Sequence, residues 1–200
     1  MSHRWSQALA WPATPKEIAG IAALSAAASV LELLNIDVAF PLLPVISFDP
    51  VGIPIAIAAI LYGPAGALVA VSIMGFTIAA RGNPIGATFK TTAELSTAVP
   101  LALALAAFRG TLAKRGAGIW ILLTIAASVA IVSRVAVMTP FNYVFLQQLR
   151  LLPEALVLDL LLPIGIFNAV QGVINLVPAF LIVTALPPDL RPSWLTWGEG

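Results

Sequence analysis

The most constraining feature of the chain is an uncharged stretch between Asp49 and Arg81. Its 31 residues include no Asp, Glu, Lys, Arg or His, and no soluble helix of ordinary size could keep such a surface out of water. A continuous helix of this length would rise roughly 45 Å, against about 30 Å for the hydrocarbon core of a bilayer. The stretch is therefore predicted to lie in lipid and to bend or break.

The break is expected at Gly63-Pro64, because glycine permits an unusual φ and proline lacks the N–H that a continuing helix needs. Asp49 and Pro50 are interpreted as the helix start, with the acidic residue as N-cap and the proline at the first helical position. We expect two membrane spans joined by a tight hairpin. A single tilted and kinked helix is the alternative.

The overall composition agrees with a membrane protein of several spans. Hydrophobic residues make up 60% of the 200 positions and charged residues 10%, whereas soluble domains carry about 25% charged residues. The net charge is +1, and no basic stripe with interleaved aromatics predicts nucleic-acid binding. The absence of cysteine excludes disulfides and thiolate metal sites. No metal or cofactor is predicted.

The hydrophobic segments predict an all-α protein with six transmembrane helices in one domain, residues 17–188. Residues 1–16 are expected to form an interfacial tail and residues 189–200 a C-terminal tail. Thr14 and Glu17 form a capping box before the first helix. The other helices are expected on both sides of Gly63 and near 88–108, from 119 to about Pro140, and at 160–186.

The protein is expected in the plasma membrane, and its basic residues favour both termini in the cytoplasm. Six spans would put six Lys and Arg residues on the side of the termini and three on the other side, and the side richer in basic residues usually faces the cytoplasm. The three on the outer side are Arg81, Lys90 and Arg150.

Four charged residues fall within or beside the predicted spans, all in the outer half: Glu32, Glu94, Arg134 and Asp159. Charges in a span are costly and normally face a cavity, a partner or the surface. The apolar, proline-interrupted loop 35–48 lies at the same side and is interpreted as a lid. We expect a binding pocket for a small amphipathic solute beneath it. The alternative is that Glu94, Arg134 and Asp159 only neutralise one another.

Three amide side chains follow one face of the last helix. Asn168, Gln171 and Asn175 are spaced by three and four residues, which places them on the same side of a helix. Amides both donate and accept, so they suit a ligand with hydroxyls or a heterocyclic edge. Hydrogen bonding between helices is the alternative.

Alanines follow one face of the first helix. Ala19, Ala23 and Ala27 recur every four residues, and small residues at this spacing let helices approach closely in lipid. The stripe predicts a docking surface for another helix, although alanine is also common in membrane helices.

Five segments together resemble the substrate-binding S components of energy-coupling factor (ECF) vitamin importers, most closely the riboflavin-specific RibU type. They are F-D-P-V-G-I-P with L-Y-G-P-A-G within 48–66, T-A-E-L at 92–95, R-V-A-V-M-T-P-F-N-Y at 134–143 and F-N-A-V-Q-G at 167–172. The resemblance covers most of residues 17–186. It implies a six-helix bundle with an outward cavity that holds one vitamin beneath the first loop.

The resemblance also implies partners and residue roles. The chain would capture riboflavin from outside, and helix 1 would dock a transmembrane coupling subunit that carries two cytoplasmic ATPases. By resemblance, Glu94, Asn142 and Asn168 would contact riboflavin, and Asp49 would shape the start of the second helix. One departure is Gln171, which stands where the family tends to have lysine, so another small heterocyclic vitamin is the second choice.

Other function classes have less support. An intramembrane enzyme would need a nucleophile and a base within reach, but the sequence has no H-E-x-x-H or G-x-S-x-G motif and no histidine in a predicted span. A phosphate-binding G-x-x-x-x-G-K-[ST] loop is also missing from the sequence, so energy for uptake has to come from a partner. A membrane scaffold without a ligand is the remaining alternative.

Overall fold

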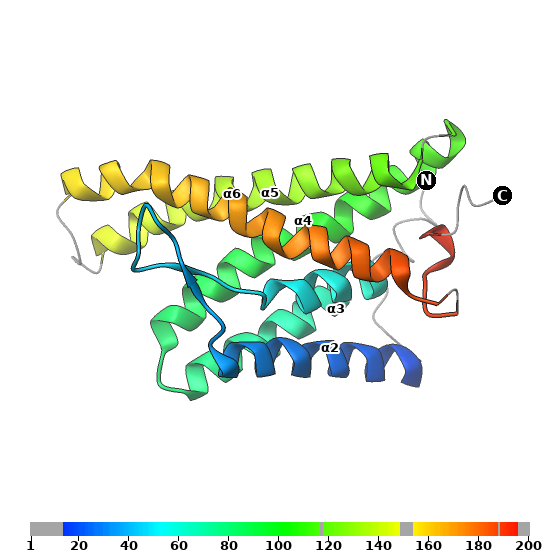
Figure 1. Ribbon diagram of the computed structural model, residues 1–200, viewed down its shortest axis with the longest axis horizontal. Coiled ribbons are helices and arrows are strands. Elements are labelled where there is room, and N and C mark those ends of the chain that lie inside the picture. Colours follow the sequence, from blue (N-terminus) through cyan, green and yellow to red (C-terminus); the bar gives the residue numbers. More distant parts are fainter. Residues whose placement is uncertain (1–13, 117, 149–153, 188, 196–200) are drawn as a thin grey trace.

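The computed structural model describes residues 14–116, 118–148, 154–187 and 189–195. The predicted tail up to residue 13, Arg150 and residues 196–200 lie outside these ranges. Within them, five long helices lie side by side in an elongated bundle (Figure 1). They are α2 (Pro15–Leu34), α3 (Gly52–Ala80), α4 (Pro84–Lys114), α5 (Ile119–Gln148) and α6 (Glu154–Ala185), followed by the short helix η1 (Ser193–Leu195).

Helix α3 folds back on itself at Gly63. This glycine has φ 68° and ψ −162°, which is not helical, and it separates two helical segments. Both ends of α3 lie close to Glu32. Asp49, just before α3, shares the Lys90 ammonium with Glu32, and Arg81, just after α3, donates from Nη1 to the Glu32 carbonyl at 3.1 Å. The chain therefore reverses at Gly63, where the break was predicted, and Figure 1 shows the two segments running in different directions.

The expected count of six membrane spans is not confirmed. Five helices of the described ranges are long and apolar enough to cross a bilayer, and α3 counts as one of them. The sixth span is missing because the two segments of α3, before and after Gly63, differ in length. Its first segment, residues 52–62, rises only roughly 16 Å, about half of the hydrocarbon core, because the helix begins deep in the bundle.

The predicted helix starts are right in one case and wrong in another. Thr14 accepts from the Glu17 N–H and completes the capping box at the start of α2. Asp49 is not the N-cap of α3, whose N-cap is Val51. Instead, Asp49 Oδ1 accepts the Val51 N–H at 2.8 Å, so its carboxylate fixes the turn that precedes the helix.

Four other predicted helix boundaries are wrong because the helices are longer. Helix α4 begins at Pro84 rather than near residue 88, since Asn83 accepts from the Gly86 N–H as N-cap, and it extends to Lys114 rather than ending near residue 108. Helix α6 begins at Glu154 rather than near residue 160. Helix α5 continues through Pro140 to Gln148.

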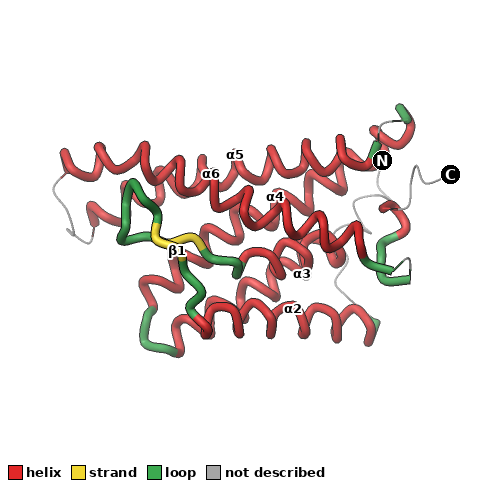
Figure 2. Tube along the Cα trace, in the orientation of Figure 1, coloured by secondary structure: helices red, strands yellow, loops and turns green. Residues whose placement is uncertain are grey.

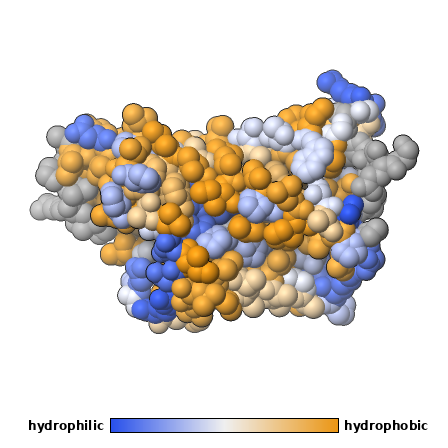
Figure 3. All heavy atoms as spheres, viewed as in Figure 1, coloured by the Kyte–Doolittle hydropathy of each residue, from blue (hydrophilic) through white to orange (hydrophobic). Residues whose placement is uncertain are grey.

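Helix α3 forms the centre of the bundle and packs against α2, α4 and α6. All five long helices contribute fully buried side chains to the core, among them Ala28, Ile55, Leu101, Leu122 and Leu176. Large apolar side chains also point outward: Phe76 is 74% exposed and Leu162 73%. Hydrophobic residues make up most of the face in Figure 3, with hydrophilic patches at its ends and one close to the centre. Such an extended apolar surface suits lipid, not water.

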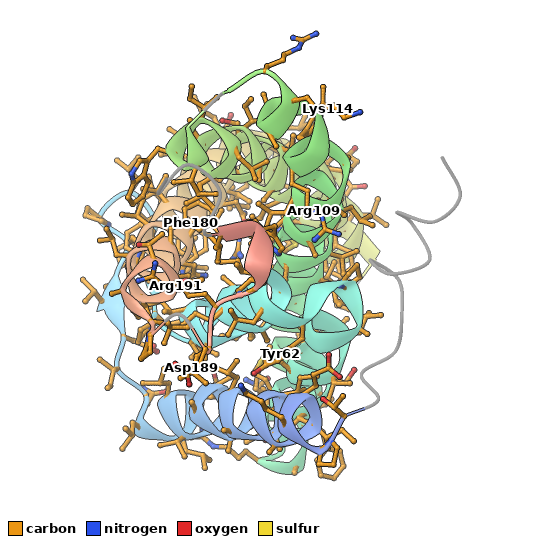
Figure 4. The ribbon with its side chains drawn as sticks, turned by 90° about the vertical axis from the view of Figure 1, so that its right-hand side faces the viewer. Tyr62, Arg109, Lys114, Phe180, Asp189 and Arg191 are labelled. Atoms are coloured by element: carbon orange, nitrogen blue, oxygen red, sulfur yellow. The ribbon has the colours of Figure 1, made fainter. Side chains whose placement is uncertain are left out.

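The two ends of the bundle differ. Lys16 Nζ donates to the Asp189 carbonyl at 2.9 Å, so the start of α2 lies beside the segment that follows α6. Figure 4 views this terminal end, with the basic residues Arg109, Lys114 and Arg191. The opposite end, called the lid end below, carries the 35–48 loop. That the terminal end faces the cytoplasm stays a prediction, which depends on the distribution of basic residues along the sequence.

Candidate functional site

A cavity of about 500 Å³ opens at the lid end of the bundle. Its walls come from α4, α5 and α6, and part of the 35–48 loop and Asp49 border it. This volume lies within the range of about 300–1,000 Å³ that is typical of small-molecule sites. The structure therefore places a pocket where the sequence predicted one.

The lid, residues 35–48, is a short β-hairpin. Strand β1 (Val38–Ala39) pairs antiparallel with β2 (Ser47–Phe48), and this is the only sheet in the described ranges (Figure 2). Phe48 stacks on Phe167 of α6 with ring centroids 5.0 Å apart, and Phe40 meets both rings edge-on or tilted. This aromatic trio holds the lid against α6.

A second aromatic trio lies between α4 and α5. Phe89 makes edge-on contacts with Phe141 and Phe145, with ring centroids 5.2 Å and 4.9 Å apart. Phe89 and Phe167 both border the cavity. Because they come from separate aromatic clusters on different helices, the cavity has two aromatic walls, and such walls favour flat aromatic ligands.

The inner part of the cavity contains a buried ion pair. Arg134 Nη1 of α5 donates to Glu94 Oε1 of α4 at 2.8 Å, and both side chains are 4% exposed. The guanidinium also donates to Thr97 Oγ1 and to Asn168 Oδ1, each at 3.1 Å. The pair thus fastens α4, α5 and α6 together beside the cavity, which is how buried charges are tolerated.

Gln171 connects α6 to the turn before α3. Its Nε2 donates to the Asp49 carbonyl at 2.7 Å, and its Oε1 accepts the Asp49 N–H at 3.3 Å. The same Nε2 donates to Asn175 Oδ1 at 2.9 Å, and Asn175 Nδ2 donates to Glu94 Oε1 at 3.4 Å. A continuous polar network therefore joins the ion pair to the segment that follows the lid.

Lys90 forms a second charged cluster at the lid end. Its ammonium pairs with Glu32 at the end of α2 and with Asp49 Oδ2 at 3.2 Å. All three side chains are mostly buried. Lys90 borders the cavity, whereas Glu32 does not, so this cluster links the cavity wall to α2.

Gly52, the first residue of α3, lets the backbone approach the polar network. A Cβ on Gly52 would lie 1.9 Å from Asn175 Nδ2 and 2.6 Å from Glu94 Oε2. No side chain fits there without displacing these groups. The position requires glycine for a close approach, in keeping with glycine's role beside packed backbone.

Five of the six predicted ligand-binding residues border the cavity: Asp49, Glu94, Asn142, Asn168 and Gln171. Asn175 does not border it. It is buried beneath the cavity and positions Gln171 and Glu94. The alternative of a Glu94, Arg134 and Asp159 charge cluster is wrong in part, because Glu94 and Arg134 pair while Asp159 is exposed on α6.

The predicted docking residues Ala19, Ala23 and Ala27 are all exposed on the outer face of α2. Ile21, Ser25 and Ala28 turn inward instead and are buried. The alanine stripe is therefore uncovered within the described chain and is available to a partner or to lipid.

Four more residues border the cavity although no role was predicted for them from the sequence: Phe89, Phe167, Lys90 and Asp37. Lys90 was counted only for topology, although its position four residues before Glu94 placed it on the same helix face. The aromatic residues carried no signal of their own, because phenylalanine is common in membrane helices. Within the described ranges, no group of three or more His, Cys, Asp or Glu residues is suited to hold a metal ion.

Of the comparisons with known proteins, the one with solved structures finds a match. No protein-family model matches the chain, and no curated protein matches it. A solved structure described as the S component of a bacterial ECF transporter matches with a TM-score of 0.66 and 21% sequence identity, over 84% of this chain and 92% of that one. The chain therefore has the fold of a bacterial ECF transporter S component.

Proposed function

We propose that this chain is the membrane-embedded substrate-binding subunit of an ECF-type importer and that it captures riboflavin or a related flavin from outside the cell. The observation that carries the proposal is the cavity of about 500 Å³ beneath a hairpin lid, in a bundle with the S-component fold. A scaffold protein would not need such a cavity.

The chemistry of the walls supports a flavin. A flavin has a flat, largely apolar ring system and a chain of hydroxyl groups. Phe89 and Phe167 provide aromatic surface for the ring, and Asn142, Asn168 and Gln171 provide amides that can both donate to and accept from hydroxyls. Glu94 provides an acceptor that Arg134 keeps in place.

Transport requires partners that supply energy. The sequence has no phosphate-binding loop, so we propose a transmembrane coupling subunit and two cytoplasmic ATPases. The exposed stripe of Ala19, Ala23 and Ala27 on α2 is the proposed surface for the coupling subunit. The solute would enter from outside, the lid would close over it, and the partners would reorient the loaded subunit to release the solute inside.

A second candidate is another small heterocyclic vitamin, bound in the same cavity. The residue that favours this candidate is Gln171. It is a neutral amide at a position where the family that the sequence resembles tends to have lysine. Both of its amide atoms are engaged by Asp49 and Asn175.

The test is to purify the chain in detergent and to examine it for a bound flavin by its absorption near the flavin bands. The protein stripped of ligand is then titrated with riboflavin, and quenching of the flavin fluorescence is followed. Saturable one-to-one quenching supports the proposal. A colourless protein that leaves riboflavin fluorescence unchanged, but binds another vitamin in calorimetry, would favour the second candidate.

A further inference from the structure

The two ends of the lid, residues 35–48, meet at one side chain. Glu32, in the last turn of α2, lies three residues before the lid, and Asp49 directly follows it. The Lys90 ammonium of α4 pairs with both carboxylates, and its Nζ lies 3.2 Å from Asp49 Oδ2. One cation therefore joins the start and the end of the lid to α4.

Further contacts hold each end of the lid in place. At its start, Asn35 ends α2 in the left-handed conformation, with φ 52°, and Arg81 Nη1 donates to the Glu32 carbonyl at 3.1 Å. At its end, the Gln171 side chain binds both backbone groups of Asp49. The ends of the lid are thus fixed by polar contacts to α4, to α6 and to the residue after α3.

The tip of the lid, residues 40–46, is held by contacts of a different kind. It connects the two strands, and its side chains Leu42 and Val45 are exposed. Phe40 contacts Phe167 of α6 with ring centroids 5.6 Å apart. Ring contacts are individually weak, whereas separation of a mostly buried ion pair leaves charges without partners. The tip is therefore easier to lift than the ends.

We propose that Lys90 is a positioning residue that clamps both ends of the lid to α4, so that the lid opens by lifting of its tip while its ends stay in place. The inference rests on the proposed function, because it concerns how the ligand enters and leaves the cavity. Lys90 borders the cavity, whereas Glu32 does not. Replacement of Glu32 therefore tests the clamp without a change to the cavity wall.

The first experiment measures how fast riboflavin leaves the full chain in nanodiscs, by stopped-flow fluorescence. Glu32→Gln keeps the size of the side chain but removes its charge. We expect riboflavin to dissociate about five- to tenfold faster, because a charge-assisted hydrogen bond at the start of the lid is weakened. Lys90→Met should have at least the same effect, and Lys90→Arg, which keeps the charge, should restore slow dissociation.

The matched control is Asp159→Asn. It removes one carboxylate from an exposed position of α6 that does not border the cavity. We expect this variant to release riboflavin at the wild-type rate. If Lys90 acted only by touching the ligand, Glu32→Gln would behave like this control.

A second experiment follows the lid in the absence of ligand. The chain has no cysteine of its own, so pairs of spin labels can be attached at exposed positions that do not border the cavity. Ile36→Cys with Ile85→Cys reports the distance from the start of the lid to α4. Leu42→Cys with Leu162→Cys reports the distance from the tip to α6. We expect a narrow distance distribution for the first pair and a broad one for the second, and Glu32→Gln should broaden the first.

Either of two results would overturn the clamp. One is a Glu32→Gln variant that releases riboflavin at the wild-type rate, and the other is a distribution between the lid start and α4 that stays unchanged in this variant. If the wild-type chain does not bind riboflavin, the proposed ligand is overturned instead, and the spin-label experiment still decides whether the clamp exists.

Discussion

Gln171 and Asp49 form a reciprocal pair between α6 and the segment that joins the lid to α3. The side-chain amide donates to the Asp49 carbonyl at 2.7 Å and accepts from its N–H at 3.3 Å. One side chain thus satisfies both backbone groups of the residue that directly follows the lid. Because Gln171 also borders the cavity, it connects ligand contact with the position of the lid.

Replacement of Gln171 should therefore loosen the lid as well as remove a ligand contact. Gln171→Glu keeps the size but loses the donor to the Asp49 carbonyl, so we expect ligand to dissociate faster, with affinity weakened about tenfold or more for a lost buried hydrogen bond. Stopped-flow fluorescence with riboflavin measures the dissociation rate. The Asn168→Ala variant is the comparison. Asn168 borders the cavity but makes no hydrogen bond to Asp49, so its replacement should weaken affinity by several-fold without loosening the lid. Unchanged dissociation in Gln171→Glu would contradict the assigned role.

The Arg134 and Glu94 pair should stabilise the bundle only while both partners are present. Removal of either one, as in Arg134→Met or Glu94→Gln, should cost about 3–5 kcal/mol, because a buried charge is left unpaired. The double variant should be more stable than the sum of the single effects predicts. Thermal unfolding in detergent, followed by circular dichroism, measures this. Additive effects would mean that the two side chains do not interact in solution.

Gly52→Ala should disturb the polar network from the backbone side. The added Cβ would overlap Asn175 Nδ2 and Glu94 Oε2, so we expect weaker ligand binding together with a lower melting temperature. The matched control is Gly165→Ala on α6, where the nearest heavy atoms to an added Cβ are 4.0 Å away. Equal effects of the two substitutions would show that Gly52 has no special role.

Gly63→Ala should destabilise the reversal of α3. Its φ of 68° with ψ of −162° is a conformation that essentially only glycine adopts. We expect a loss of about 1–3 kcal/mol in the free energy of unfolding, seen as a lower melting temperature in detergent. Gly118→Ala is the control, since an added Cβ there meets nothing within 4 Å. A melting temperature equal to that of the control would mean that α3 bends elsewhere.

A bulky residue on the exposed alanine stripe should separate binding from transport. Ala23→Trp is expected to abolish uptake of riboflavin by cells that carry the partner subunits, because it prevents close helix packing. Ligand binding to the purified chain should not change, since α2 does not border the cavity. Val132→Trp is the control on α5, where Val132 is 67% exposed. Normal uptake by Ala23→Trp would assign the docking surface to another face.

Much of the site was predictable from the sequence, because charged and amide side chains are rare on surfaces that face lipid. Glu94, Asn168 and Gln171 were selected because polar groups in a span need a cavity or a partner, and all three border the cavity. Asn175 satisfied the same criterion but lies beneath it. Helical spacing places residues on a common face, but it does not determine how deeply each one is buried.

The sequence by itself determined the membrane environment, the capping box at Thr14 and the break at Gly63, because these depend on local composition and backbone chemistry. Only the tertiary structure decided which charges meet. It paired Arg134 with Glu94, left Asp159 exposed and brought Lys90 to Asp49 and Glu32. It also showed that the first segment of α3 begins deep in the bundle, since the contact of Gly52 with Asn175 depends on how α3 packs against α6. Such contacts join residues far apart in the chain, and no local pattern encodes their distance.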